Sequence, residues 1–252
     1  MKLTCILLIF NVNFLCVNSK LLLKAHSELS FDNKYEITGN IGNYIKIENL
    51  FWCFQKCIEN SKCVSFFFNE NQQKCILHPI SFWNKTPCQS ESGWKFYNTK
   101  DASGRCPSSN GLTYYRYLDL CYKIHDTVKM DYNGLVKPKC FSDGLELIRI
   151  DSAEKNSYVL EVTDYVAKYG SGLHICIQGT NSISGNLAWT FDDGSPMTYF
   201  NWDKTYTIPQ PENKASESVI AIARPVGTWH DFYFNTNFLC LFLCEKKMIP
   251  LK

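Results

Sequence analysis

The chain has 252 residues, of which 45% are hydrophobic and 20% are charged, and its formal net charge is +2. This near-neutral balance, without a long basic run, gives no indication of a nucleic-acid or anionic-membrane partner. The length suits one large domain or two small ones.

The first nineteen residues have the pattern of a secretory signal. Lys2 supplies a basic start, residues 5–17 form an apolar stretch, and Val17-Asn18-Ser19 offers small-residue cleavage chemistry. Two Asn residues interrupt the stretch, which is also shorter than the ~20 apolar residues that a membrane span needs. We therefore predict a signal peptide at 1–19 and a secreted, extracellular protein without a membrane span.

The cysteine count agrees with an oxidising compartment. The chain has thirteen cysteines, and removal of Cys5 and Cys16 with the predicted signal leaves eleven. In a secreted protein so many cysteines indicate disulfides rather than zinc or redox chemistry. Since eleven is odd, one thiol is either free or bonded to another chain.

These cysteines fall into two groups, which are separated by a polar segment at 97–111 that is rich in Ser, Gly and Asn, as linkers are. The first group is Cys53, Cys57, Cys63, Cys75 and Cys88; the second is Cys106, Cys121, Cys140, Cys176, Cys240 and Cys244. We predict an N-terminal module at 20–98, a linker at 99–105 and a second domain at 106–247.

In the first module, Cys53 and Cys57 are four residues apart and so lie on one face of a predicted helix. Residues 63–68 and 74–77 then predict two strands around a polar turn. A short helix buries little surface by itself, so disulfides to a hairpin would compensate for a small core.

This pattern resembles the PAN/Apple module in its shorter CW-type variant. The resemblance implies disulfides between Cys53 and Cys75 and between Cys57 and Cys63. Cys88 would then be the unpaired thiol, and a disulfide-linked dimer through it is an open alternative. Such modules bind proteins or glycans in other chains or act as spacers, and both readings stay open. Asn84-Lys85-Thr86 is a candidate N-glycosylation site.

The second domain opens with a predicted hairpin at 106–124. Residues 145–150 alternate like a half-buried strand. Asp151 and Glu154 have the spacing of a capping box before an amphipathic helix. Its apolar side would carry Tyr158, Val159, Val162, Tyr165 and Val166. The short apolar run 237–244 predicts a fully buried strand.

Several ordered landmarks in this domain resemble a long-form C-type lectin domain. They are "CP…CY" at its start, "AWTFDDGSPMTYFNW" (188–202), "GTWHD" (227–231) and the final Cys244-Glu245. The expected fold class is therefore α+β, a helix-on-sheet PAN/Apple-like module followed by a disulfide-stapled C-type lectin fold. Gly134 and Pro138 occur where the family has its first helix, which we expect to be short or broken.

The lectin resemblance also implies disulfides between Cys106 and Cys121 and between Cys140 and Cys244. The family's inner disulfide is missing, because its positions fall near Ser218 and Phe234. Cys176 and Cys240 remain in predicted core strands. They either form a replacement disulfide or stay as two buried thiols.

The loop 206–232 contains the candidate calcium and sugar site. The resemblance implies calcium ligands at Gln210 and Glu212, around a cis Pro211, with a separate Glu at Glu217 and a final carboxylate at Asp231. In the family the same oxygens also contact sugar hydroxyls. Calcium prefers oxygen ligands of this kind and tolerates a flexible sphere.

Three departures weaken this site. Glu212 is one methylene longer than the usual residue, and His230 replaces an amide ligand with a nitrogen that calcium rarely takes. If Ser218 takes the position of the missing cysteine, Glu217 also lies one residue off and Ser216 occupies the ligand position. Calcium therefore stays an open alternative in a degenerate site. Otherwise Pro211 shapes the loop, Trp229 belongs to the core and Asp231 accepts hydrogen bonds from backbone amides.

Other chemistry finds little support. A zinc site at His230 would need converging partners, and no histidine has a paired spacing with it (His26, His78, His125, His174). No hydrolase, metalloprotease, phosphate-binding or dinucleotide motif occurs, and Asp192-Asp193 lie in an expected turn. We predict a non-enzymatic recognition protein that binds carbohydrate through the lectin-like domain. Calcium-independent protein–protein adhesion is the alternative, and a purely structural role is the third reading.

Overall fold

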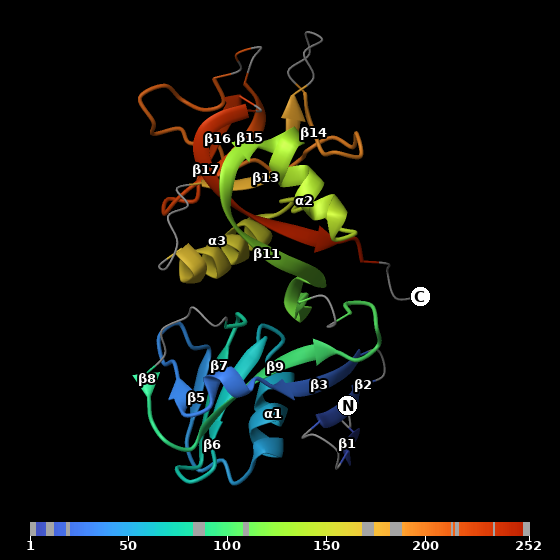
Figure 1. The fold of residues 1–252 in the computed structure, drawn as a ribbon, viewed down its shortest axis with the longest axis vertical. Coiled ribbons are helices and arrows are strands. Elements are labelled where there is room, and N and C mark those ends of the chain that lie inside the picture. Colours follow the sequence, from blue (N-terminus) through green and yellow to red (C-terminus); the bar gives the residue numbers. More distant parts are fainter. Residues whose placement is uncertain are drawn as a thin grey trace. The chain divides into compact units, whose positions relative to one another are not determined.

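A computed structural model describes residues 4–8, 13–18, 21–82, 89–107, 111–167, 174–181, 188–212, 214, 217–233 and 235–248. The chain divides into two compact units (Figure 1), one formed by 1–121 with 248–252 and the other by 122–247. The division lies C-terminal to the predicted linker 99–105, and the exact domain limits stay a prediction. Asn84 and Cys88 lie outside the described residues, so their predicted roles stay predictions.

The N-terminal unit is built on an antiparallel sheet. Its described strands follow the order β1-β2-β3-β9-β6-β7-β5. Their bounds are β1 Thr4–Leu8, β2 Asn13–Asn18, β3 Leu21–Ser27, β5 Gly42–Tyr44, β6 Ser65–Asn69, β7 Lys74–His78 and β9 Trp94–Asp101. A second small sheet joins β4 (Lys34–Tyr35) to β8 (Gln89–Ser90). The predicted hairpin is present as β6 and β7, with Phe67 opposite Ile76. The predicted signal segment contains β1 and β2, and its removal stays a prediction.

Helix α1 (Leu50–Glu59) packs on this sheet through one apolar face. The side chain of Asn49 caps its start by accepting a hydrogen bond from the backbone N–H of Trp52 (3.2 Å). Cys53, Phe54 and Cys57 are buried on the inner face. Disulfides then join Cys53 to Cys75 in β7 and Cys57 to Cys63. These are the pairs that the PAN/Apple resemblance implied.

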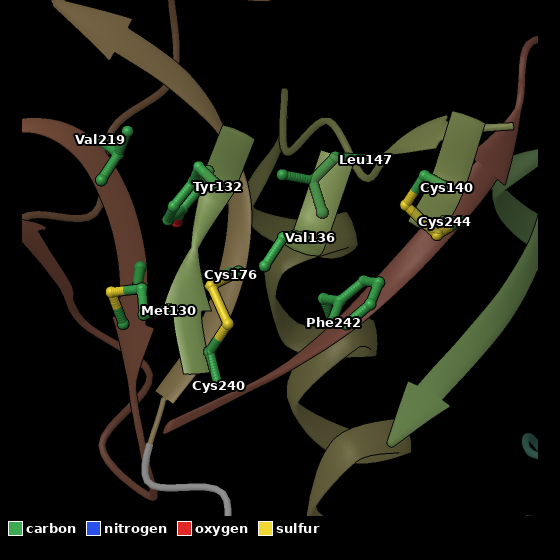
Figure 2. Close-up of a cluster of buried hydrophobic side chains, with 11 residues drawn as sticks. Met130, Tyr132, Val136, Cys140, Leu147, Cys176, Val219, Cys240, Phe242 and Cys244 are labelled. Atoms are coloured by element: carbon green, nitrogen blue, oxygen red, sulfur yellow. A yellow bond between two sulfur atoms is a disulfide. The ribbon is translucent and has the colours of Figure 1, made fainter. Parts of the chain in front are cut away.

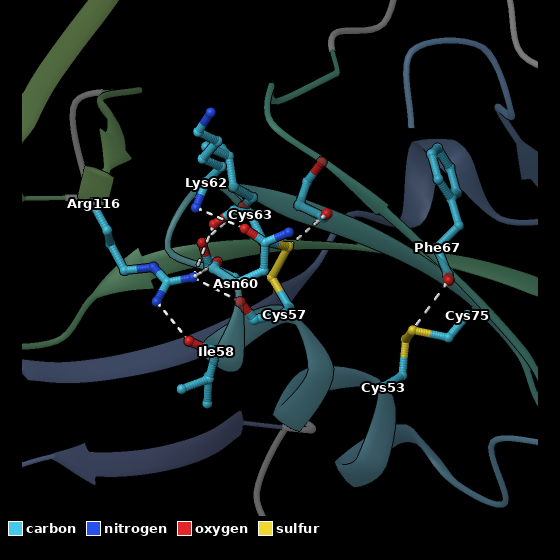
Figure 3. The surroundings of a disulfide bond; sticks show 12 residues. Cys53, Cys57, Ile58, Asn60, Lys62, Cys63, Phe67, Cys75 and Arg116 are labelled. Carbon is cyan, nitrogen blue, oxygen red and sulfur yellow. Dashed lines mark hydrogen bonds between the residues drawn. A yellow bond between two sulfur atoms is a disulfide. The ribbon is translucent and has the colours of Figure 1, made fainter. Parts of the chain in front are cut away.

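The C-terminal end of α1 is held by Arg116, which lies in a 3-10 turn (Arg116–Leu118) after β10 (Thr113–Tyr115). Its guanidinium donates to the carbonyl oxygens of Cys57 (2.7 Å), Ile58 (3.0 Å), Asn60 (2.7 Å) and Cys63 (3.2 Å), as Figure 3 shows. The last carbonyls of a helix have no partner within it, so a cation there satisfies them. Residues around Arg116, predicted as part of the second domain, therefore hydrogen bond to the first helix.

The C-terminal unit contains a mixed sheet. Its strand path is β11-β17-β13-β15-β16, with β12 paired to β17 and β14 to β13. The bounds are β11 Leu120–Asp131, β12 Glu146–Leu147, β13 His174–Asn181, β14 Trp189–Thr190, β15 Glu217–Ala223, β16 Trp229–Tyr233 and β17 Asn235–Lys246. β13 runs parallel to β17 and antiparallel to β15. The predicted strand at 145–150 is mostly wrong, because only Glu146 and Leu147 pair with β17 before the chain turns toward the helix.

The helices of this unit differ in detail from the prediction. The first is short, as expected: a π-helical turn (Tyr132–Val136) leads into α2 (Lys137–Ser142), where Pro138 occupies the first turn. α3 spans Ala153–Ala167. Its cap is Ser152, whose hydroxyl accepts from the N–H of Lys155 (3.2 Å), so the predicted capping box at Asp151 and Glu154 is displaced by one residue. Tyr158, Val159 and Val162 are buried as predicted, while the side chains of Tyr165 and Val166 lie outside the described part.

A cluster of buried side chains joins β11, α2, β13, β15 and β17 (Figure 2); it includes Met130, Tyr132, Val136, Leu147, Val219 and Phe242. Disulfides join Cys140 to Cys244 and Cys176 to Cys240 within it, and a further one joins Cys106 to Cys121. Cys176 and Cys240 are therefore a disulfide and not two buried thiols. The prediction of a fully buried 237–244 strand is wrong at its start, where Phe238 and Leu239 are 51% and 38% exposed.

Candidate functional site

Asp203 organises the start of the candidate loop. Its backbone N–H donates to Trp229 O (3.0 Å), and its carbonyl accepts from the N–H of Gln210 (2.8 Å). Its carboxylate oxygen Oδ1 accepts from the N–H of Thr205 (2.9 Å) and of Tyr206 (3.1 Å). The hydrogen bonds from Thr205, more than any other contact, hold the pKa of Asp203 well below its usual range. The loop is thus folded around one carboxylate that is ionised at neutral pH.

Three of the predicted site residues lie together beyond this turn. The N–H of Glu212 donates to Asp231 Oδ1 (2.9 Å), and the N–H of Asp231 donates to Gln210 Oε1 (3.2 Å). Gln210 Nε2 in turn donates to Glu212 Oε1 (3.3 Å). The Gln210–Pro211 peptide bond is cis. Gln210, Glu212 and Asp231 therefore form one hydrogen-bonded group, and their role in ligand binding stays a prediction.

The fourth predicted residue, Glu217, joins them through Lys214. The Lys214 ammonium is paired with Glu212 Oε2 and lies 3.4 Å from Glu217 Oε1. Glu217 is 7% exposed, and its second oxygen, Oε2, has no hydrogen-bond partner among the described residues. Burial, together with the charges of Asp231 and Glu212, raises the pKa of Glu217, whereas the hydrogen bond to Lys214 lowers the pKa of Glu212. One ammonium thus compensates two carboxylates.

His230 does not point to this group. Its Nε2 lies 3.2 Å from Asp203 Oδ2, and Tyr206 packs against its ring with the centroids 4.9 Å apart. The imidazole therefore supports the turn at Asp203. In the family motif an amide at this position would supply an oxygen ligand. His230 instead pairs with Asp203.

The donor set does not fit calcium. Calcium needs six to eight oxygens free to converge on one point. Asp231 Oδ1 accepts a backbone N–H, Glu212 and Glu217 hold Lys214, and His230 pairs with Asp203. In the part of the chain that the structure describes, no three His, Cys, Asp or Glu side chains converge as metal ligands. Glu217 Oε2 is buried and has no hydrogen-bond partner among the described residues.

Trp229 and Pro211 have structural positions. Trp229 is fully buried, and its indole N–H donates to Asn156 Oδ1 (2.8 Å), which anchors the loop motif to α3. Pro211 lines a pocket of about 400 Å³ together with Trp189, Met197, Phe200 and Trp202. Phe200 stacks on Trp202 with ring centroids 5.7 Å apart and keeps 38% of its surface exposed. The pocket is therefore apolar and aromatic, with Phe200 at its accessible side.

Two residues that organise the loop, Asp203 and Lys214, were not among the predicted site residues. Asp203 follows the last Trp of the lectin-like motif, and a carboxylate two residues before a Thr in a loop is a signal for this kind of turn. Lys214 lies inside the predicted ligand loop between Glu212 and Glu217, and its charge sign was the available clue. The paired carboxylates Asp192 and Asp193 do lie in a turn, as expected; they pair with Lys137 (2.7 Å) and Arg149 (3.1 Å).

Comparisons with known proteins agree with these two regions. Residues 30–93 match the family model of the PAN domain. The chain is 24% identical over 157 residues to the C-type mannose receptor 2 of Mus musculus; the match covers 60% of this chain and 10% of the receptor. The chain thus spans about a tenth of the length of that relative.

Solved structures with similarity include the mouse scavenger receptor C-type lectin carbohydrate-recognition domain. Its identity is 23%, with 52% of this chain and 92% of that chain covered and a TM-score of 0.40. Human lithostathine is 17% identical, with 57% and 94% covered and a TM-score of 0.46.

The chain therefore matches a PAN domain at residues 30–93 and is similar to a C-type lectin receptor over 157 residues, and disulfides occur in both units. Among the described residues, none of the helices has both the length and the apolar character that a membrane crossing requires.

Proposed function

We propose that this protein is a secreted, non-enzymatic recognition protein whose lectin-like domain binds carbohydrate without calcium, at the aromatic pocket beside Pro211. The observation that carries the proposal is the pocket itself, with Trp189, Phe200 and Trp202 as its aromatic lining. Small-ligand sites are typically concave and lined by aromatic side chains, with a few polar groups for orientation. Aromatic rings offer a flat apolar face to the C–H side of a sugar ring.

The lack of fit for calcium supports a site of this kind, because the oxygens that would coordinate the metal and the sugar hydroxyls are engaged with Lys214 and with backbone amides. The relative named for mannose makes that hexose a first ligand to test. The oxidised cysteines fit an extracellular location.

The experiment is a glycan array probed with the full chain in calcium and in chelator. We expect equal binding in both conditions, loss of binding in Phe200→Ala, and retention in Tyr206→Ala. Tyr206 is the matched control because it is an exposed aromatic residue of the same loop (53% exposed) that does not line the pocket. Release of the chain by chelator, or silence in both conditions, would contradict the proposal.

One observation favours the second candidate, calcium-independent adhesion to a protein. Tyr206 and Ile208, two residues apart on the loop, are 53% and 52% exposed, and neighbouring exposed apolar side chains often mark protein contacts. If this candidate holds, Tyr206→Ala with Ile208→Ser would abolish capture of an extracellular partner by cross-linking, while Phe200→Ala would leave it intact. The two sets of variants therefore separate the two functions.

A further inference from the structure

Lys214 occupies an unusual place for a surface lysine. Its side chain is 53% exposed, yet its ammonium contacts two carboxylates whose side chains are only 16% and 9% exposed, those of Glu212 and Glu217. The hydrogen bond to Glu212 raises the pKa of Lys214, so the ammonium stays charged. It reaches the loop group from the solvent side.

Without this cation the group would carry uncompensated charge. Asp231 is 5% exposed, and its charge raises the pKa of Glu217. Glu212 is tied to Asp231 through its backbone N–H (2.9 Å). Three carboxylates close together at low exposure repel one another and need a positive charge to remain ionised. Lys214 is the described cation that contacts two of them.

The group also retains a carboxylate oxygen that no described residue satisfies. Glu217 Oε2 is buried and has no hydrogen-bond partner among the described residues. A buried carboxylate oxygen without a partner is costly, and it is the kind of atom that a divalent cation would take. The Gln210 side chain, 3% exposed, belongs to the same hydrogen-bonded group, because its Oε1 accepts from the N–H of Asp231 (3.2 Å).

We infer that Lys214 is a built-in counter-ion of Glu212 and Glu217, which makes these carboxylates unfit to hold a divalent cation. The ammonium supplies within the chain the positive charge that a calcium ion would otherwise supply, and it excludes the ion by holding both carboxylates. Removal of the ammonium frees them. This inference concerns only the cation and does not rest on the proposed sugar binding.

The test is a calorimetric titration of calcium into the full chain, with the melting midpoint recorded in calcium and in chelator. The natural chain should show no binding heat and no shift of the midpoint. Lys214→Gln should bind calcium with a dissociation constant of about 1 mM, as weak extracellular calcium sites do, and calcium should raise its midpoint. Lys214→Gln with His230→Asn, which adds an amide oxygen donor, should bind more tightly.

Three controls make the result decisive. Lys137→Gln removes an ammonium from the pair with Asp192 elsewhere in the same unit and should remain without a calcium response. Lys214→Arg keeps the charge and should also show no calcium response. This variant can be measured even if Lys214→Gln folds poorly. Lys214→Gln with Glu217→Gln should lose the response that Lys214→Gln gained. Calcium binding by the natural chain or by Lys214→Arg would overturn the inference, as would a folded Lys214→Gln without any calcium response.

Discussion

Two cations hold two parts of this molecule, and they do so with different partners. Arg116 in the N-terminal unit donates to four backbone carbonyls at the end of α1, and burial lowers its pKa to about 10. Lys214 in the C-terminal unit contacts two carboxylates and stays half exposed. The first cation satisfies neutral dipoles and the second compensates charge.

This difference determines what could replace each cation. The carbonyls around Arg116 need several donors in a fixed planar arrangement, which a metal ion or a lysine does not reproduce. The carboxylates around Lys214 need a positive charge but no fixed planar arrangement of donors, so a guanidinium can also compensate them. Arg116 is therefore specifically required at the end of α1, whereas another cation can take the place of Lys214.

We expect the strands that carry Glu217 and Asp231 to be held in place independently of the loop charges. The disulfide between Cys176 and Cys240, 64 residues apart in sequence, joins β13 to β17, and β13 pairs with β15, which in turn pairs with β16. Replacing both cysteines by Ala should cost about 4 kcal/mol of unfolding free energy, because the unfolded chain loses a long-loop constraint. Urea unfolding of the full chain measures this loss. A variant as stable as the natural chain would show that the loop charges themselves hold the strands.

Loss of the Arg116 guanidinium should be the next largest effect. Arg116→Ala leaves four carbonyls at the end of α1 without their donor and should cost the N-terminal unit about 3 kcal/mol. Arg116→Lys should recover only part of it. Arg105→Ala is the control, because it removes a guanidinium from the exposed carboxylate of Asp119 (2.6 Å) and should cost about 0.5 kcal/mol. Equal losses of unfolding free energy in Arg105→Ala and Arg116→Ala would contradict a specific role of Arg116 at the end of α1.

Acid should weaken the N-terminal unit through His78. Burial lowers the pKa of His78 to about 4 from its usual 6.5, and its Nε2 lies 2.9 Å from Glu36 O. The folded state then binds fewer protons than the unfolded state between these values, so stability is lost as the pH falls below about 6.5. The loss at pH 5 should be about 2 kcal/mol. His78→Gln should flatten this part of the stability profile measured by urea unfolding; an unchanged profile would rule out His78 as its source.

The smallest effect should be that of salt on the loop. Raising NaCl from 0.1 M to 1 M shortens the screening length from about 10 Å to about 3 Å and weakens partly exposed ion pairs. Chymotrypsin cleavage after the exposed Tyr206 should therefore accelerate about twofold in the natural chain. In Lys214→Gln, which already lacks the ion pairs, the same change of salt should have no effect. An equal effect of salt on the cleavage rate of both chains would show that the Lys214 ion pairs are not its cause.

Much of the framework could be predicted from the sequence, because cysteine spacing and motif order constrain the chain strongly. The helix with Cys53 and Cys57, the hairpin after it and four of the five described disulfides follow from these patterns and the family resemblance. The sequence left the pairing of Cys176 with Cys240 open. The errors are local. The strand expected at 145–150 pairs with β17 only at Glu146 and Leu147. The cap of α3 is Ser152 and not Asp151. Both side chains offer an oxygen, and the packing of the helix determines which of them reaches its first turn.

The candidate site could be predicted only in part. Motif positions brought Gln210, Glu212, Glu217 and Asp231 into one hypothesis, and the structure places them in contact through hydrogen bonds and Lys214. The direction of His230 toward Asp203 could not be read from the motif, since it depends on the turn that Asp203 builds. The same is true of the Lys214 ammonium, whose long side chain can reach several partners.

The central claim is that the chain's own charges and hydrogen bonds hold the loop from Asp203 to Asp231, without calcium. Amide hydrogen exchange of this loop, compared in calcium and in chelator, tests it most directly. The amides of Tyr206, Gln210, Glu212 and Asp231, which donate within the loop, should show the same protection in both conditions. Loss of their protection in chelator, restored on return of calcium, would contradict it.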